Sequence, residues 1–158
     1  MDKITTCLWF DRNAEEAARF YVGLFPDSEI TEIMRSPGDY PNGKGGDVLL
    51  VLFKLAGRRY SGLNGGPGFP FGQAISMSID CADQAEVDRY WAALSAHPEN
   101  EQCGWVKDKF GLSWQIVPRA MPRLLSDPDA AKRKRVFKAM MNMKKLDVAA
   151  LERAAAQG

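Results

Sequence analysis

The fold of this chain is decided by residues 5–24, which read TTCLWFDRNAEEAARFYVGL. Alternating positions over Thr5 to Phe10 predict a half-buried strand. Asn13, followed three residues later by Glu16, is the pattern of a helix cap reinforced by a capping box. Apolar side chains then recur at the spacing of one helix face, at Ala17, Phe20, Tyr21 and Leu24. The stretch therefore predicts a strand followed directly by an amphipathic helix.

The same pattern returns 70 residues later in the chain. Asp83 stands where Asn13 stands in the first copy, and Glu86 again lies three residues after the cap. A strand pattern over residues 75–80 precedes this cap, and the apolar stripe after it consists of Val87, Tyr90, Trp91 and Leu94. A strand, a cap and a stripe at one common offset predict that the chain contains two copies of one structural module.

The common offset also assigns equivalent strand positions to the two copies. It makes Thr6 equivalent to Ser76, and Trp9 equivalent to Ile79. Because side chains alternate between the two faces of a strand, equivalent positions are expected on equivalent faces. On the last predicted strand, alternation places Ser113, Gln115 and Val117 on one face and Trp114 and Ile116 on the other.

Strand-like segments follow each predicted helix. They cover residues 29–35, 48–55 and 59–64 in the first copy, and 101–106 and 112–117 in the second. Residues 36–46 are rich in residues that break regular structure, and they predict a long flexible loop. The order of elements predicts two βαβββ modules, over about residues 2–65 and 72–118, joined at the glycine-rich segment 65–68.

Residues 119–158 predict a C-terminal helical tail. Its apolar stripe of Val136, Met140 and Met143 is expected to cover a partner subunit. The basic run at 132–135 is interpreted as a solvated helix face.

Composition narrows the class of protein. The 158 residues carry a net charge of +1, which argues against a dedicated nucleic-acid binder. Apolar residues make up 46% of the chain, yet none of its apolar runs approaches the length of a membrane span. The N-terminus has no signal-peptide core, and the three cysteines form no CxxC motif. We therefore expect a cytoplasmic protein in a reducing compartment, without membrane or nucleic-acid partners.

Five short motifs are spread over most of the chain. They read LWFD at 8–11 with AEEAA at 14–18, GLNGGP at 62–67, FPF at 69–71, CGWVKD at 103–108 and FGLSWQIVP at 110–118. Together they resemble the PhnB-like branch of the vicinal oxygen chelate superfamily, which has the fold of glyoxalase I, bleomycin-resistance proteins and extradiol dioxygenases. The resemblance implies an α+β fold whose paired βαβββ modules form curved, mostly antiparallel sheets. It also implies a homodimer, because single-chain members commonly dimerise to complete their cups.

Members of this branch often carry the label 3-demethylubiquinone 3-methyltransferase. Methyl transfer from S-adenosylmethionine usually requires a doubly wound sheet with a glycine-rich turn after the first strand. Here the first strand ends in Phe10-Asp11-Arg12-Asn13, which contains no glycine. The glycine-rich segment 62–68 is followed by FPF rather than by a helix. No cofactor is therefore expected.

The resemblance also implies where a metal would bind, because metal-dependent relatives place His or Glu on the concave faces of the sheets. The corresponding positions here are Thr6, Ser76 and Gln115, with the remaining one on residues 59–64 among Tyr60, Ser61 and Asn64. None of these is a usual metal ligand, and His97 lies in a turn. No metal site is expected.

Nucleophilic chemistry receives little support from the sequence. Cys103 has no visible base partner and is interpreted as a buried structural thiol. Asp108, between Lys107 and Lys109, is interpreted as part of an ion pair in a turn.

The remaining interpretation is a metal-free cup that binds a small organic molecule, with an unknown reaction. The candidate cavity residues are Thr6, Tyr60, Asn64, Ser76, Ser78, Trp105 and Gln115. Aromatic residues such as Trp105 either line this cup or fill the core. Two alternatives stay open: a metal-dependent enzyme of the same superfamily with unusual ligands, and a regulatory or scaffolding dimer without a ligand.

Overall fold

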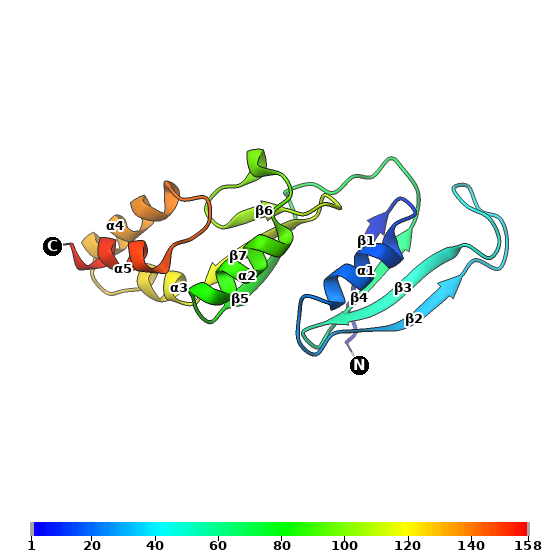
Figure 1. Cartoon of the computed structure of the whole chain (residues 1–158), viewed down its shortest axis with the longest axis horizontal. Coiled ribbons are helices and arrows are strands. Elements are labelled where there is room, and N and C mark those ends of the chain that lie inside the picture. The colour runs from blue at the N-terminus through cyan, green and yellow to red at the C-terminus, as the bar shows by residue number, and fades with distance from the viewer. Residues whose placement is uncertain (1, 158) are drawn as a thin grey trace. The chain divides into compact units, whose positions relative to one another are not determined.

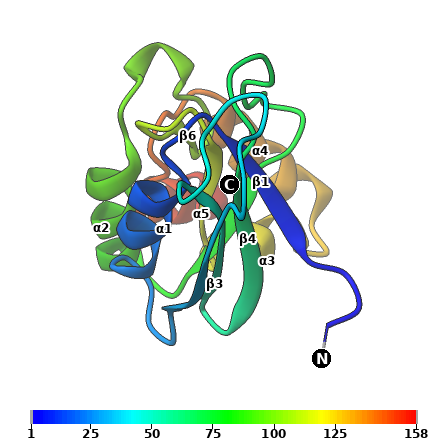
Figure 2. The ribbon, with the colours of Figure 1, turned by 90° about the vertical axis from the view of Figure 1, so that its right-hand side faces the viewer.

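The structure is a computed structural model that describes residues 2–157. It divides into two compact units at the boundary between Phe71 and Gly72. The elements of both units are labelled in Figure 1, and Figure 2 shows the same ribbon turned by 90° about the vertical axis. Each unit is described by itself.

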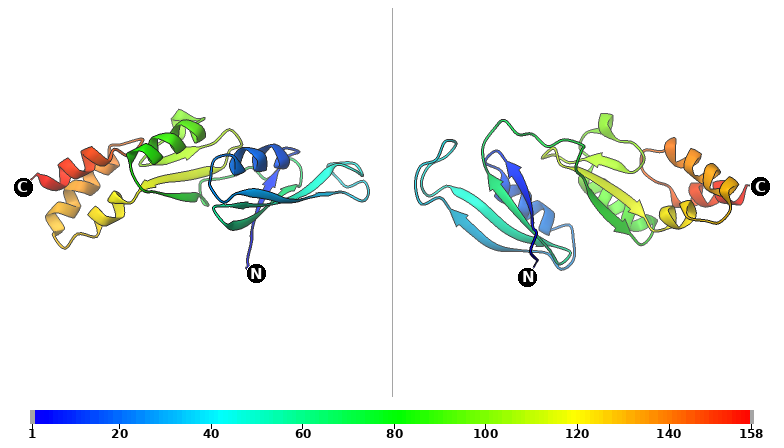
Figure 3. Two further views of the ribbon diagram at one scale, coloured as in Figure 1. Left: turned by 60° about the horizontal axis from the view of Figure 1, so that its bottom comes forward. Right: turned by 180° about the vertical axis from the view of Figure 1, so that it is seen from behind.

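The first unit is a four-stranded sheet with one helix. Its elements are β1 (Thr6–Phe10), α1 (Ala14–Val22), β2 (Glu29–Arg35), β3 (Val48–Leu55) and β4 (Arg58–Asn64). The strand order is β1-β4-β3-β2, with β1 and β4 parallel and the other pairs antiparallel. Figure 3 shows α1 on one face of the sheet, and no helix within residues 2–71 covers the other face. We call the uncovered side of each sheet its open face.

The second unit repeats this plan with one strand fewer. It begins with β5 (Met77–Cys81), α2 (Gln84–Leu94), the short 3₁₀ turn η1 (Pro98–Asn100), β6 (Trp105–Lys107) and β7 (Ser113–Pro118). In the order β5-β7-β6, β5 and β7 are parallel while β6 and β7 are antiparallel. The α+β architecture of two open, mostly antiparallel sheets followed by C-terminal helices is confirmed.

Three helices, α3 (Ala120–Leu125), α4 (Ala130–Met141) and α5 (Val148–Ala156), follow β7 within the second unit. Their common core contains Leu124, Val136, Leu151 and Ala155, and Met140 and Met143 pack against it. The stripe predicted to cover a partner is thus engaged inside the tail itself.

The basic residues at 132–135 also form bonds within the tail. Arg135 donates hydrogen bonds to the carbonyls of Ala154 and Ala155 at the end of α5, at 3.1 and 3.0 Å. Lys132 forms an ion pair with Asp127 at 2.6 Å. Arg133 donates to the carbonyls of Asp127 and Pro128. The interpretation of residues 132–135 as a solvated face is therefore corrected, because three of its four side chains form bonds within the tail.

The tail is joined to α2 by the side-chain amide of Gln84. This amide donates to the carbonyl of Leu146 at 3.1 Å and accepts from the N–H of Val148 at 2.8 Å. Leu146 is fully buried, and its side chain lies where a Cβ on Gly104 would approach within 3.0 Å. A glycine at position 104 therefore lets the segment before α5 pack closely on the sheet.

The repeat is confirmed for the helices and corrected for the strands. α1 starts at Ala14 and α2 at Gln84, which keeps the offset of 70. The buried strand residues, however, are Leu8 and Phe10 in β1 but Ile79 and Cys81 in β5, an offset of 71. Three residues separate β1 from α1, whereas two separate β5 from α2.

The extra residue is accommodated in a left-handed turn, where Arg12 has a φ of 67°. Because side chains alternate with a period of two, one additional residue moves every side chain of β1 to the opposite face. Thr6 is therefore equivalent to Met77 and not to Ser76.

Of the two helices, only α2 is capped by the side chain that the sequence predicted. In α2 the Asp83 carboxylate accepts from the Glu86 N–H at 3.0 Å, so the predicted cap is present. The Glu86 carboxylate accepts from the Ala82 N–H at 2.7 Å, one residue before the N–H that a capping box uses. In α1 Asn13 occupies the cap position, but its side chain makes no capping bond. Asn64 supplies that bond from β4, because its Oδ1 accepts from the Ala14 N–H at 2.9 Å.

The segment predicted as a flexible loop forms several hydrogen bonds, and its flexibility stays a prediction. Ser36 N–H donates to Asp47 O and Gly46 N–H donates to Ser36 O, both at 2.8 Å, which closes the base of the loop. Nearer its tip, Asn42 Nδ2 donates to Gly65 O at 2.9 Å. Many short-range bonds replace the regular strand pairing that the glycine and proline residues prevent.

Substituting Asn64→Ala is expected to destabilise the protein by roughly 1–3 kcal/mol, because it leaves a buried N–H at α1 and a carbonyl at β3 without their partner. Asn13→Ala is the matched control and should change stability by less than about 0.5 kcal/mol. Denaturant unfolding of the full chain measures both. A loss in Asn13→Ala as large as that in Asn64→Ala would contradict the assignment of the cap to Asn64 alone.

The ion pair between Asp88 and Lys145 can be tested by titration with acid. Its ion pair with Lys145, at 2.8 Å, and its hydrogen bond from Gln84 hold the pKa of the Asp88 carboxyl below its ordinary value of 3.8. A lowered folded-state pKa contributes stability above the unfolded pKa, and that contribution is lost as the pH falls through the folded value. Lys145→Met should raise the Asp88 pKa in an NMR titration, whereas Lys144→Met should not. An unchanged Asp88 pKa in Lys145→Met would refute the pairing.

Candidate functional site

Four of the predicted cavity residues come together on the open face of the second sheet. Ser78 on β5, Gln115 on β7 and Trp105 on β6 are cross-strand partners, so they form one row on one face. Gln115 Nε2 donates to Ser76 Oγ at 2.9 Å. We call these four residues the Gln115 cluster. Ser78 is exposed and the other three are half-buried, which leaves polar groups of the cluster accessible.

The opposite face of β7 explains why Gln115 points away from the core. Trp114 and Ile116 are buried beneath α2, with Trp114 only 2% exposed, as the alternation predicts. The Trp114 indole N–H donates to the carboxylate of Asp108 at 2.8 Å. Packing and this hydrogen bond fix the register of the strand, and they therefore fix the direction of the Gln115 side chain.

Asp108 differs from its prediction. The residue is fully buried, and its carboxylate accepts hydrogen bonds from the N–H groups of Phe110 and Leu112 and from the Trp114 indole. These bonds replace the exposed ion pair that the flanking lysines predicted. A buried carboxylate surrounded by donors organises the turn before β7 rather than the surface.

The first-unit candidates lie on the other side of their sheet. Thr6 and Tyr60 are register partners, and Asn64 pairs with Phe10, so all three share the face that α1 covers. Tyr60 is buried and its ring stacks on Phe53. Their predicted place on the concave face is wrong. Thr6 lies on the covered face because the longer connection before α1 reverses the faces of β1, and Tyr60 and Asn64 lie there because they alternate with Ser61 and Leu63 along β4. Whether any of them contacts a ligand stays a prediction.

Except for Ser61, the residues that occupy the open face of the first sheet were not among the sequence candidates. They are Cys7 and Trp9 on β1, Ser61 and Leu63 on β4, Leu50 and Leu52 on β3, and Glu32 and Met34 on β2. The same face also carries the charged residues Glu29, Lys54 and Arg59. The Trp9 indole donates to Gly66 O at 2.8 Å, and Phe69 meets its ring edge-on at a centroid distance of 5.0 Å. The extra residue between β1 and α1 distinguishes this face, but it can be counted only once the structure shows where β1 and β5 end.

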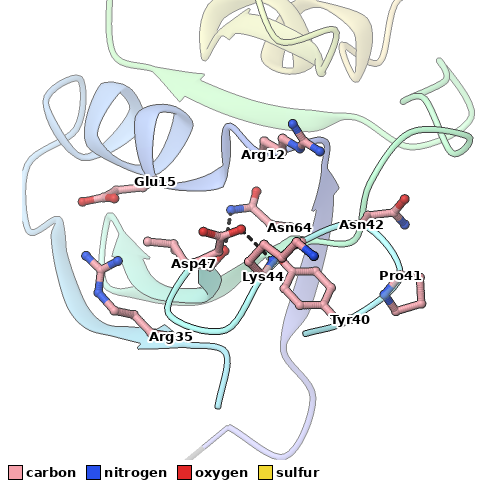
Figure 4. A pocket seen from close by; sticks show the side chains of 11 residues that line it. Arg12, Glu15, Arg35, Tyr40, Pro41, Asn42, Lys44, Asp47 and Asn64 are labelled. Carbon is pink, nitrogen blue, oxygen red and sulfur yellow. Dashed lines mark hydrogen bonds between the residues drawn. The ribbon is translucent and has the colours of Figure 1, made fainter. Parts of the chain in front are cut away.

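A separate cavity of about 700 Å³ lies at the end of the first sheet where α1 begins. Its wall is formed by Arg12, Glu15, Arg35, Tyr40, Pro41, Asn42, Gly43, Lys44, Asp47, Val48 and Asn64. Figure 4 shows Arg12 and Arg35 on opposite sides of this pocket. We call it the arginine pocket. No residue of the Gln115 cluster belongs to it.

Other reactive groups are arranged for structure. Burial raises the pKa of the Cys81 thiol to about 11, with further contributions from Glu86 and Asp80, so the thiol stays protonated at neutral pH. Cys103 is half-buried rather than buried as predicted, and its thiol lies beside the Met140 carbonyl and the Met141 sulfur. His97 precedes the turn η1 and faces Glu99 at 3.5 Å.

Over residues 2–157 no group of three or more His, Cys, Asp or Glu side chains is placed to hold a metal ion. Within the same range no helix has the length and apolar character needed to cross a bilayer.

The chain matches one known protein family over most of its length. Residues 2–117 match the model of the family described as 3-demethylubiquinone-9 3-methyltransferase. The helices α3 to α5 follow after this match. Among curated proteins, no sequence matches the chain.

Several solved structures are similar. One is a putative 3-demethylubiquinone-9 3-methyltransferase, PhnB protein, from Bacillus cereus, with 34% identity and a TM-score of 0.63, covering 74% of this chain and 99% of that chain. A protein from Pseudomonas aeruginosa is 22% identical with a TM-score of 0.53, covering 75% and 98%. A glyoxylase/bleomycin resistance protein/dioxygenase domain from Frankia sp. EAN1pec is 13% identical with a TM-score of 0.44, covering 75% and 92%. The predicted PhnB-like resemblance is confirmed by the family match and the Bacillus cereus structure.

Proposed function

Because the chain belongs to the 3-demethylubiquinone-9 3-methyltransferase family with PhnB-like members, we propose that it binds a small organic molecule, without a metal, on the open face of its second sheet. The binding site is the Gln115 cluster. The proposal concerns binding, and it assigns no methyl transfer to this chain.

The hydrogen bond between Gln115 and Ser76 is the observation that carries the proposal. One N–H of the Gln115 amide is engaged by Ser76, which orients the amide and leaves its second N–H and its oxygen for a ligand. A group that both donates and accepts suits a neutral carbonyl or hydroxyl better than a cation.

The neighbouring residues favour a ligand with an apolar body. Trp105 lies beside Gln115 in the same cross-strand row and supplies a flat apolar wall. Ser78 adds a hydroxyl on the other side of Gln115. An apolar surface with a few convergent polar groups is typical of small-molecule sites.

Gln115→Ala should weaken the binding of a ligand by a few-fold to about tenfold, because one hydrogen bond is lost. The ligand is found by a thermal-shift screen of small metabolites and aromatic drugs, and its affinity is then measured by calorimetry. Gln157→Ala, at the exposed end of α5, is the matched control and should bind like the parent.

A ligand that binds Gln115→Ala as tightly as the parent would place the site elsewhere. Trp114→Ala serves as a check on the strand, since its buried ring should cost roughly 3–5 kcal/mol of stability when removed. Normal melting of Trp114→Ala would contradict the assignment of faces on β7.

We also propose that two copies of the chain associate through the open face of the first sheet. This face carries Trp9, Leu50, Leu52 and Leu63 in half-buried positions, and Met34 is 43% exposed beside them. An apolar sheet face of this kind is usually covered by another surface. A second copy is the expected occupant, because two-fold association is the commonest arrangement of soluble homo-oligomers.

Light scattering should give a mass of about 35 kDa, twice the 17.5 kDa of one chain. Leu63→Glu should reduce it to the monomer mass, because a charge would be buried at the centre of the face. Phe137→Glu changes a 53% exposed residue on α4 and should leave the mass unchanged. A monomeric parent protein at micromolar concentration would overturn the proposal, as would a dimer that tolerates Leu63→Glu but not Phe137→Glu.

A further inference from the structure

We propose that the arginine pocket is a second binding site, for a small organic anion that carries a carboxylate or a phosphate group. It involves residues of the first unit only, so it is independent of the Gln115 cluster. The chemistry shared by both ligand types is an oxyanion held by guanidinium groups.

The charged residues that line the arginine pocket favour an anionic ligand. Glu15 is paired with Arg19 at 2.7 Å, and Lys44 faces Asp39 at 3.3 Å. Arg12 and Arg35 form no ion pair with a carboxylate anywhere in the described part of the chain.

Arg35 keeps most of its hydrogen-bonding capacity. One NH group of its guanidinium donates to the Gly46 carbonyl at 2.9 Å, which positions the side chain against the loop. The other N–H groups remain available for a ligand, and the full positive charge is uncompensated. An anchored arginine loses less conformational freedom on binding than a free one.

Asp47 contributes a negative charge to the wall of the arginine pocket. Its carboxylate accepts a hydrogen bond from the Lys44 backbone N–H at 2.8 Å, so one oxygen is engaged within the loop. Asp47 repels the charged end of an anionic ligand, so this end is expected on the arginine side of the pocket. The pocket therefore fits a small anion whose remaining groups are uncharged.

The pocket is built before any ligand arrives. The loop that forms one wall is closed by the Ser36–Asp47 backbone bonds, and reciprocal backbone bonds at 3.0 and 3.1 Å join Tyr40 and Gly43. Asn42 ties the loop to Gly65, and Asn64 ties the start of α1 to the start of β3. A cavity of about 700 Å³ with fixed walls is in the size range of small-molecule sites.

The test uses three probes of similar size: glycerol 3-phosphate, glycerate and uncharged glycerol. Their affinities for the full-length protein are measured by NMR titration at low ionic strength, where charge interactions are least screened. We expect one or both anions to bind and glycerol not to bind. Tighter binding of glycerol 3-phosphate identifies the ligand class as a phosphate ester, and tighter binding of glycerate identifies it as a carboxylate.

Variants then separate this pocket from general surface charge. Arg12→Gln and Arg35→Gln should each weaken anion binding by about tenfold, the usual effect of one lost charge-assisted hydrogen bond. Asp47→Asn should strengthen binding by a few-fold, since it removes the repelling charge of the wall. Arg58→Gln makes the same charge change on an exposed residue outside the pocket and should leave binding unchanged.

The proposal is overturned if the anions bind no better than glycerol. It is also overturned if Arg58→Gln weakens binding as much as Arg35→Gln does, or if Asp47→Asn weakens binding while its melting temperature stays at the parent value. Gln115→Ala is included as a further variant. If Gln115→Ala removes anion binding while the arginine variants do not, the anion occupies the Gln115 cluster and the second site is refuted.

Discussion

One side-chain amide, that of Asn64, joins three elements of the first unit. Its oxygen accepts from the first N–H of α1, and its nitrogen donates to the Val48 carbonyl at 2.9 Å, where β3 begins. The helix can lie this close to β4 because Gly62 has no side chain, and a Cβ there would meet the Ala14 methyl group at 3.3 Å. Arg12 lies just before this junction and Asp47 just before Val48. The junction therefore positions both sides of the arginine pocket at the same time.

The second unit caps its helix and joins its elements with different residues. Its helix is capped locally by Asp83, and the register position that corresponds to Asn64 is occupied by Pro118, which has no side-chain amide. Buried polar groups stabilise other places instead: the Asp108 carboxylate organises the turn before β7, and the Gln84 amide attaches the tail. The partners of Asp108 and Gln84 lie within the second unit, and those of Asn64 lie within the first.

The two open faces differ in their side chains. The first carries the apolar residues Trp9, Leu50, Leu52 and Leu63, whereas the second presents the Gln115 cluster together with the charged residues Asp80 and Lys107. A mainly apolar face favours association with another protein surface, and a face with convergent polar groups favours a small molecule. The family description names a methyltransferase, but a fold can host many functions, so our proposals rest on the residues of each site.

The sequence by itself determined the elements and their repetition. Helix patterns recur at the same spacing from Ala14 and from Gln84, because an apolar stripe and a capping residue are local properties. The faces of β7 were predictable for the same reason, since Trp114 and Ile116 alternate with Gln115. Only the tertiary structure decided which face of β1 is covered, because one left-handed residue at Arg12 reverses the alternation. It also decided that Asn64 caps a helix 50 residues away, since partners so distant in the chain are brought together only by the folded sheet.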